Sequence, residues 1–181
     1  VVGDYLKNKY GLSQEEQNLM WKGFYQDYTI GKINTEEFLD IFAKTYNLSR
    51  SKVTTEIFTD SFNNAMLPVA GIEDVLKKMK NKDITLAMLS DTTEMFASAR
   101  KSGLFSNYFD HVFLSYELGF RKPDKRAFKA VTDFYNLEPS EIFFIDDNES
   151  NVFSAIDFGM KATVFKSSKE LEVALIENSI L

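Results

Sequence analysis

The chain has 181 residues, 44% of them apolar and 14% aromatic, so it can bury one good core, or one core and a small accessory domain. A net charge of -6 argues against an extended nucleic-acid surface, and the lack of cysteine excludes disulfides and thiolate metal sites. No apolar run approaches the roughly 20 residues that a membrane helix needs. No signal-peptide pattern opens the chain, so we expect a cytoplasmic protein without membrane contacts.

Residues 1–66 contain no convincing strand and are expected to form a small helical bundle. Ser13 opens a capping box before a helix that we expect to end at Gly31. Asn34 and Ser49 are expected to begin two further helices. Aromatic residues recur at helical spacing through this region, and we interpret them as its core rather than as a cofactor site.

Residues 67–181 instead alternate between helical and strand patterns. The expected elements in chain order are a helix over 69–80, a strand over 84–90, a helix over 94–102, a strand over 112–115, a helix over 124–135, a strand over 142–145, a helix over 149–158, a strand over 162–165 and a last helix from about 168. Repeated strand and helix units predict an α/β fold, namely a Rossmann-like parallel sheet with helices on both faces.

Polar side chains stand at comparable points of this pattern. Ser90 ends the first strand, Lys122 lies in a loop before a helix, and Asp146 and Asp147 follow the third strand. The carboxyl ends of parallel strands meet at one edge of a sheet, where ligands usually bind. A hydroxyl, an ammonium group and two carboxylates at that edge predict a site for phosphate and Mg²⁺.

Each of these residues also has a simpler interpretation. Ser90 could cap the following helix, and Lys122 could be a solvated surface lysine. Asp147 could cap the helix near residue 149, while Asp146 pairs with a lysine. The ordered combination is more specific than any one of its members.

Three segments resemble motifs of a known family. Residues 89–91, 119–128 and 143–151 resemble the second, third and fourth motifs of the haloacid dehalogenase-like hydrolase superfamily. Residues 1–66 resemble the helical cap that one branch of this superfamily inserts after its first core strand. The resemblance implies a Rossmann-like core, Mg²⁺ dependence and hydrolysis of a small phosphorylated metabolite through an aspartyl-phosphate.

The resemblance also implies a role for each site residue. Ser90 would hydrogen-bond the transferring phosphoryl group, with Asp91 beside it in the phosphate-binding set. Lys122 would hold that group beside the nucleophile. Asp146 and Asp147 would ligate or orient Mg²⁺, one of them directly and the other through water.

One motif of the superfamily is not found in the sequence. The first motif is a strand ending in Asp-x-Asp that supplies the nucleophile, and Asp4 does not fit it because no apolar strand precedes it. The missing strand would be central, so apolar edges are expected on both neighbours. Truncation of the chain, a natural pseudoenzyme and a strand from a partner chain are the competing explanations.

We favour truncation, because the other motifs look intact, and we expect little turnover from residues 1–181 alone. A 2-haloacid dehalogenase is the sister possibility within the superfamily. Those enzymes need no metal, so the paired carboxylates favour the metal-dependent phosphatase.

Overall fold

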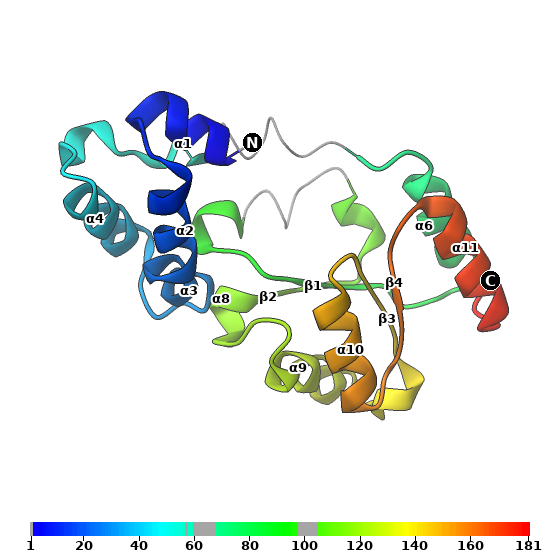
Figure 1. The fold of residues 1–181 in the computed structure, drawn as a ribbon. Coiled ribbons are helices and arrows are strands. Elements are labelled where there is room, and N and C mark those ends of the chain that lie inside the picture. Colours follow the sequence, from blue (N-terminus) through cyan, green and yellow to red (C-terminus); the bar gives the residue numbers. More distant parts are fainter. Residues whose placement is uncertain (1, 57, 60–67, 98–104) are drawn as a thin grey trace.

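The computed structural model describes residues 2–56, 58–59, 68–97 and 105–181. A group of helices near the N-terminus lies at one end of the molecule, and an α/β part that contains all the described strands lies at the other (Figure 1). The predicted boundary between residues 66 and 67 falls outside the described residues.

The N-terminal helices confirm the predicted capping box at Ser13 and the predicted helix start at Asn34, where the structure shows a second capping box. Their bounds are α1 Val2–Tyr10, α2 Gln14–Lys22, α3 Phe24–Thr29 and α4 Thr35–Thr45, followed by the 3-10 turn η1 Arg50–Lys52. Ser13 and Asn34 each accept a hydrogen bond from the backbone of the third helical residue, and the glutamate there bonds back to the cap.

Two helix predictions in this region need correction. The helix expected to run from Ser13 to Gly31 is divided at Gly23, where an added Cβ would lie 2.8 Å from the Leu19 carbonyl oxygen. The helix expected from Ser49 begins instead as the short turn η1. Residues 57 and 60–67 of its predicted span lie outside the described residues.

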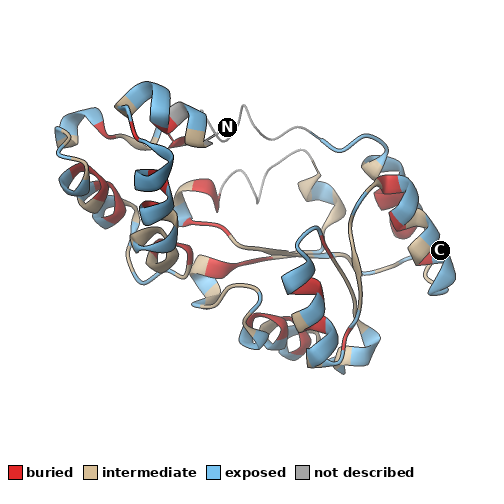
Figure 2. Cartoon of the chain, viewed as in Figure 1, coloured by how far each residue is buried: buried red, intermediate tan, exposed pale blue. Residues whose placement is uncertain are grey.

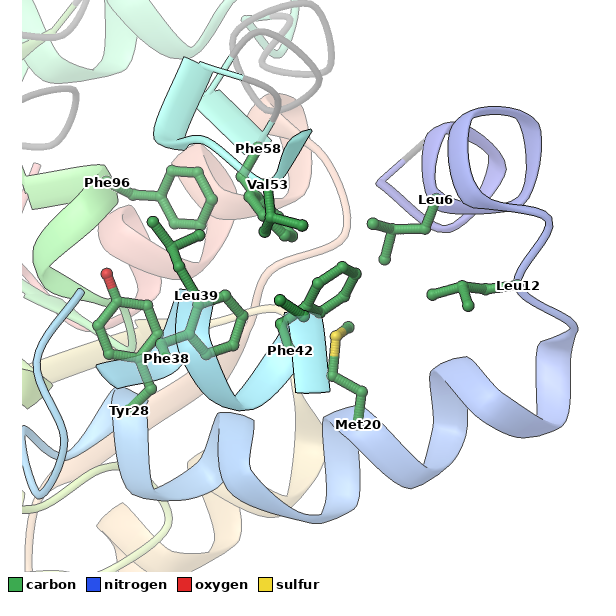
Figure 3. Close-up of a cluster of buried hydrophobic side chains, with 11 residues drawn as sticks. Leu6, Leu12, Met20, Tyr28, Phe38, Leu39, Phe42, Val53, Phe58 and Phe96 are labelled. Atoms are coloured by element: carbon green, nitrogen blue, oxygen red, sulfur yellow. The ribbon is translucent and has the colours of Figure 1, made fainter. Parts of the chain in front are cut away.

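These helices enclose an aromatic core, as predicted (Figure 3). Phe38 and Phe42 are at most 1% exposed, and the Phe38 ring stacks on Tyr28 with centroids 4.6 Å apart. Phe42 contacts further aromatic rings, including Phe58 at 5.2 Å. Phe96, from the α/β part, packs into the same cluster, so the core crosses the junction between the two parts.

The α/β part contains four parallel strands in two pairs. Its elements are α6 Ile72–Lys80, β1 Ala87–Ser90, η2 Glu94–Phe96, η3 Ser106–Tyr108, β2 His111–Leu114, α8 Ser115–Leu118, α9 Lys125–Tyr135, η4 Pro139–Glu141, β3 Phe143–Asp146, α10 Glu149–Phe158, β4 Lys161–Val164 and α11 Ser168–Glu177. Strand β1 pairs with β2, and β3 pairs with β4. Helices α6, α9, α10 and α11 each carry both buried and exposed residues (Figure 2).

The order of elements and the parallel strand pairing agree with the predicted α/β fold. Instead of one continuous sheet, the described residues form two separate two-stranded sheets. Strand β1 also starts at Ala87 rather than at residue 84, and α6 starts at Ile72 because Gly71 precedes it with φ +77°. Of the helix expected over 94–102, the described part is the 3-10 turn η2 and Ala97.

Direct contacts join the N-terminal helices to the α/β part. The Ser115 hydroxyl accepts a hydrogen bond from the Thr92 amide at 2.9 Å and donates to the Thr29 carbonyl at 2.6 Å. Gly31 approaches Tyr116 so closely that an added Cβ would lie 2.2 Å from the Tyr116 carbonyl oxygen. None of the described helices has both the length and the apolarity needed to cross a membrane.

We predict that Phe42→Ala lowers the free energy of unfolding by about 3–5 kcal/mol, because it empties a fully buried aromatic site. Phe153→Ala is the matched control, since Phe153 is 66% exposed, and it should change stability by less than about 0.5 kcal/mol. Urea denaturation of both variants measures the difference. Equal losses would contradict the packing described for the aromatic core.

Candidate active site

The structure brings most of the predicted site residues together at the ends of two strands. Ser90 is the last residue of β1, and Asp91 follows it. Asp146 is the last residue of β3 and Asp147 follows, whereas the sequence pattern had ended that strand before both carboxylates. Lys122 lies between α8 and α9 and reaches both strand ends.

Lys122 bridges the two sheets through its ammonium group. Its Nζ donates to the Leu89 carbonyl at 2.8 Å and to Asp146 Oδ2 at 2.7 Å. The Lys122 and Asp146 side chains are only 10% and 7% exposed. A buried ion pair is held only when its remaining hydrogen-bonding groups are also satisfied.

The other oxygen of Asp146 is satisfied as well. Asp146 Oδ1 accepts hydrogen bonds from the Asn148 amide at 2.9 Å and from Asn151 Nδ2 at 3.0 Å. Asn151 is 6% exposed and was not among the predicted site residues. Its position on the first turn of α10, after an acidic strand end, was the available signal.

Asp91 fixes the backbone of the Lys122 loop. Its Oδ1 accepts a hydrogen bond from the Lys122 amide at 3.1 Å. Burial raises the pKa of the Asp91 carboxyl above its ordinary value, although the nearby charge of Lys122 opposes this shift. Asp91 therefore positions the backbone of the Lys122 loop through its side chain.

The simpler interpretations are now decided residue by residue. Asn148, not Asp147, caps α10 by accepting from the Ser150 amide. Asp146 does pair with a lysine, and that lysine is the buried Lys122 rather than a solvated one. Ser90 does not act as a helix cap, because the cap of η2 is Thr93.

Asp147 differs from its neighbour because it is exposed. Mg²⁺ commonly takes one or two carboxylates and completes its shell with water and substrate phosphate. No group of three or more His, Cys, Asp or Glu residues arranged to hold a metal occurs within the described ranges. Asp147 and the remaining lone pair of Asp146 could supply the one or two carboxylate ligands that Mg²⁺ commonly takes from a protein.

The chain is similar to known proteins in both sequence and fold. A family model described as haloacid dehalogenase-like hydrolase matches residues 5–159. A D-ribitol-5-phosphate phosphatase from Bacteroides thetaiotaomicron is 27% identical over 150 residues, which are 77% of this chain and 69% of the relative. Several other curated relatives are longer proteins, and the chain spans less than half of their length.

Solved structures agree with this comparison. A HAD family enzyme from Bacteroides thetaiotaomicron, in complex with magnesium and inorganic phosphate, is 25% identical with a TM-score of 0.73, covering 92% of this chain and 85% of that one. A predicted HAD-like family hydrolase from Porphyromonas gingivalis is 21% identical with a TM-score of 0.81, covering 98% and 88% of the two chains. The α/β fold is that of this family.

We predict that Lys122→Met lowers the free energy of unfolding by about 3–5 kcal/mol, because it leaves the buried Asp146 carboxylate without its countercharge. Adding Asp146→Asn to this variant should recover part of the loss. Lys125→Met is the control, because its ion pair with Asp157 is exposed and should contribute at most about 1 kcal/mol. Similar losses for the two lysine variants would contradict the bridging role of Lys122.

We also predict a pH dependence from Asp91. A carboxyl whose pKa is raised on folding adds stability at low pH, and this contribution is lost as the pH rises through the folded-state pKa. Asp91→Asn keeps an acceptor for the Lys122 amide but cannot ionise. In chelator-containing buffer, the stability of the unmodified chain should therefore fall relative to Asp91→Asn between pH 3 and pH 7, as measured by denaturation. A difference that does not vary with pH would refute the assignment.

Proposed function

The chain belongs to the haloacid dehalogenase-like hydrolase family, and on that basis we propose that it acts as a Mg²⁺-dependent phosphatase on small phosphorylated metabolites. One observation carries most of this proposal. The nearly buried ammonium group of Lys122 lies at the carboxyl ends of β1 and β3, bonded to the carbonyl of Leu89, which directly precedes Ser90. A fixed cation in a site of low water content stabilises the negative charge of a transferring phosphoryl group.

We propose that three hydrogen-bond donors of the site contact the phosphate. The Ser90 hydroxyl donates to a phosphoryl oxygen, and the Asp91 backbone N–H supplies a second donor. The Lys122 ammonium has one N–H left after bonding Leu89 and Asp146, and it is directed at the phosphoryl oxygens. The ammonium cannot move freely, because both existing bonds hold it.

For the metal, we propose that Asp147 is the direct ligand and that Asp146 mainly positions Lys122. Asp146 already accepts three hydrogen bonds, from Lys122, Asn148 and Asn151, whereas Asp147 is exposed. Bound Mg²⁺ would polarise the phosphoryl oxygens and offset their charge. The relative crystallised with magnesium and inorganic phosphate supports this choice of ion.

We further propose that the attacking carboxylate comes from outside residues 1–181. The proposed site residues have other tasks, because Asp146 is paired, Asp91 is turned to the Lys122 backbone and Asp147 is assigned to the metal. Residues 1–181 alone should therefore bind phosphate and metal but turn over slowly or not at all. The N-terminal helices, proposed here as a cap over residues 1–66, would then contribute to substrate selection.

The binding half of the proposal is tested on the chain as it stands. Asp147→Asn should weaken Mg²⁺ binding at least about tenfold in titration calorimetry, because it removes the exposed carboxylate that we propose as the direct ligand. Asp157→Asn, an exposed carboxylate on α10, is the matched control and should bind Mg²⁺ as the unmodified chain does. Equal binding by both variants would overturn the assignment of Asp147.

The catalytic half needs a chain that carries an attacking group. A short apolar strand ending in Asp-x-Asp is joined ahead of Val1, and phosphate release is measured on a panel of phosphate esters. We expect release that depends on Mg²⁺, that stops on chelation and that falls by a factor of about 10²–10³ or more in Lys122→Met. No release from any ester would favour a non-catalytic binding protein, and halide release in chelator would favour a dehalogenase.

A further inference from the structure

The aromatic core of the N-terminal helices is not completely filled. A cavity of about 170 Å³ lies inside it. Its lining includes Trp21, Tyr25 and Phe38 from the N-terminal helices, and Met95 and Phe96 from the turn η2 that follows β1. The cavity therefore lies at the junction between these helices and the α/β part, where the segment after β1 enters the aromatic core.

The described lining residues differ in how far they are buried. Three of them, Trp21, Tyr25 and Met95, are partly buried and form the mouth of the cavity. The others are at most 7% exposed, and Figure 3 shows these side chains in the aromatic core: Met20, Tyr28, Phe38, Phe58 and Phe96. A small molecule that enters at the mouth is therefore enclosed by buried side chains.

The cavity is apolar. Each described residue of its lining is aromatic or a methionine, and none of these carries a formal charge. Burial raises the pKa of Tyr28, so its hydroxyl stays protonated at neutral pH. An apolar cavity of roughly 150 Å³ in a protein stays free of water and binds benzene. The size and the lining of this cavity therefore favour one apolar ring over water.

Hydrogen bonds across the junction keep the walls of the cavity apart. The Met95 amide donates to the Tyr28 hydroxyl at 3.0 Å. The Glu94 carboxylate accepts from the Thr35 amide at 3.0 Å and from the Thr35 hydroxyl at 2.6 Å. Because that bond uses the Thr35 proton, the Tyr28 hydroxyl donates to the Thr35 oxygen, 2.8 Å away. An empty cavity costs most where its surroundings cannot collapse, and these bonds oppose collapse.

We propose that this cavity is a binding site for a small apolar ligand of about the size of one aromatic ring. Trp21 and Tyr25 meet edge to face with centroids 4.5 Å apart, and the methionines of the lining adapt their shape to a neighbouring ring. The ligand stabilises the junction, because it supplies the contacts that the walls of an empty cavity lack.

The ring has two possible sources. It is either a free apolar molecule or the apolar part of a phosphate ester whose phosphate binds beside Ser90 and Lys122. Met95 follows Ser90 by five residues, so it lies within roughly 18 Å of Ser90 even if the chain between them is fully extended. Only the second source rests on the proposed function, whereas ring binding itself does not.

The test uses the unmodified chain and toluene as the probe. Trp21 is the only tryptophan in the sequence, so its fluorescence reports on the cavity. We expect a saturable change in Trp21 emission, one-to-one binding in titration calorimetry and a Tm that rises with the toluene concentration. Unchanged emission, with neither heat nor a shift in Tm, would overturn the inference.

Matched lysine variants test the place of binding. Met95→Lys puts a charge at the mouth of the cavity and should weaken toluene binding at least about tenfold. Leu19→Lys is the control, because Leu19 lies on the same helix as Trp21, is 68% exposed and does not line the cavity. The control should bind toluene as the unmodified chain does. Equal binding by the two variants would contradict the inference.

A change of cavity size covers the case in which Met95→Lys does not fold. Met95→Ala enlarges the cavity, and it should bind naphthalene at least about tenfold more tightly than the unmodified chain does. Circular dichroism shows whether each variant is folded. A folded Met95→Ala chain that binds naphthalene no better would refute the assignment of the cavity.

Phosphate esters distinguish the two sources of the ring. Phenylalkyl phosphates of increasing chain length are added, with Mg²⁺, to the chain loaded with toluene. If the ring belongs to an ester, one length displaces toluene and is itself displaced by inorganic phosphate, which leaves toluene bound. If the ring is a free molecule, no ester binds more tightly than toluene does, and inorganic phosphate displaces none. Either result supports the cavity as the site of the ring.

The same titrations separate this inference from the proposed function. If toluene binds but neither the esters nor inorganic phosphate bind in the presence of Mg²⁺, ring binding stands and the phosphatase proposal falls. If inorganic phosphate binds and toluene does not, ring binding falls and the phosphate site stands.

Discussion

The ion pair between Lys122 and Asp146 connects the two halves of the α/β part. Strand pairing joins β1 to β2 and β3 to β4, but within the described residues it does not join β1 to β3. Lys122 makes that connection by bonding the Leu89 carbonyl and the Asp146 carboxylate. Because the pair is almost fully buried, its geometry is held by the cost of leaving either charge alone.

The ion pair makes the surroundings of two adjacent carboxylates different. Asp146 is buried and its oxygens accept from Lys122, Asn148 and Asn151, so it holds the lysine and the start of α10 in place. Asp147 is one residue further along and exposed. Two identical side chains thus have different surroundings, and the metal-binding role that we propose for Asp147 rests on this difference.

The sequence predicted the features that depend on local chemistry. The capping box at Ser13, the helix start at Asn34, the order of strands and helices, and the convergence of Lys122 with Asp146 all follow from short-range pattern or from the shared direction of parallel strands. The family resemblance was also confirmed. The roles assigned to Ser90 and Asp147 stay predictions.

The predictions from sequence were wrong where the structure depends on contacts between distant residues or on competition between neighbouring side chains. Helical spacing alone does not reveal the break at Gly23, where the backbone leaves helical geometry and an added Cβ would meet the Leu19 carbonyl oxygen. Asn148 displaced Asp147 as the cap of α10, since either side chain can cap and the strand ends one residue later than expected. The separation into two sheets depends on which edges meet in space, about which strand patterns carry no information.

The close approach of Gly31 to Tyr116 bears on how firmly the N-terminal helices are joined to the α/β part. Together with the Ser115 hydroxyl, which bonds Thr29 on one side and Thr92 on the other, it fixes these helices to the α/β part. The Met95 amide also donates a hydrogen bond to the Tyr28 hydroxyl, so the junction is held at several points and the N-terminal helices cannot shift as a body without breaking all of these contacts.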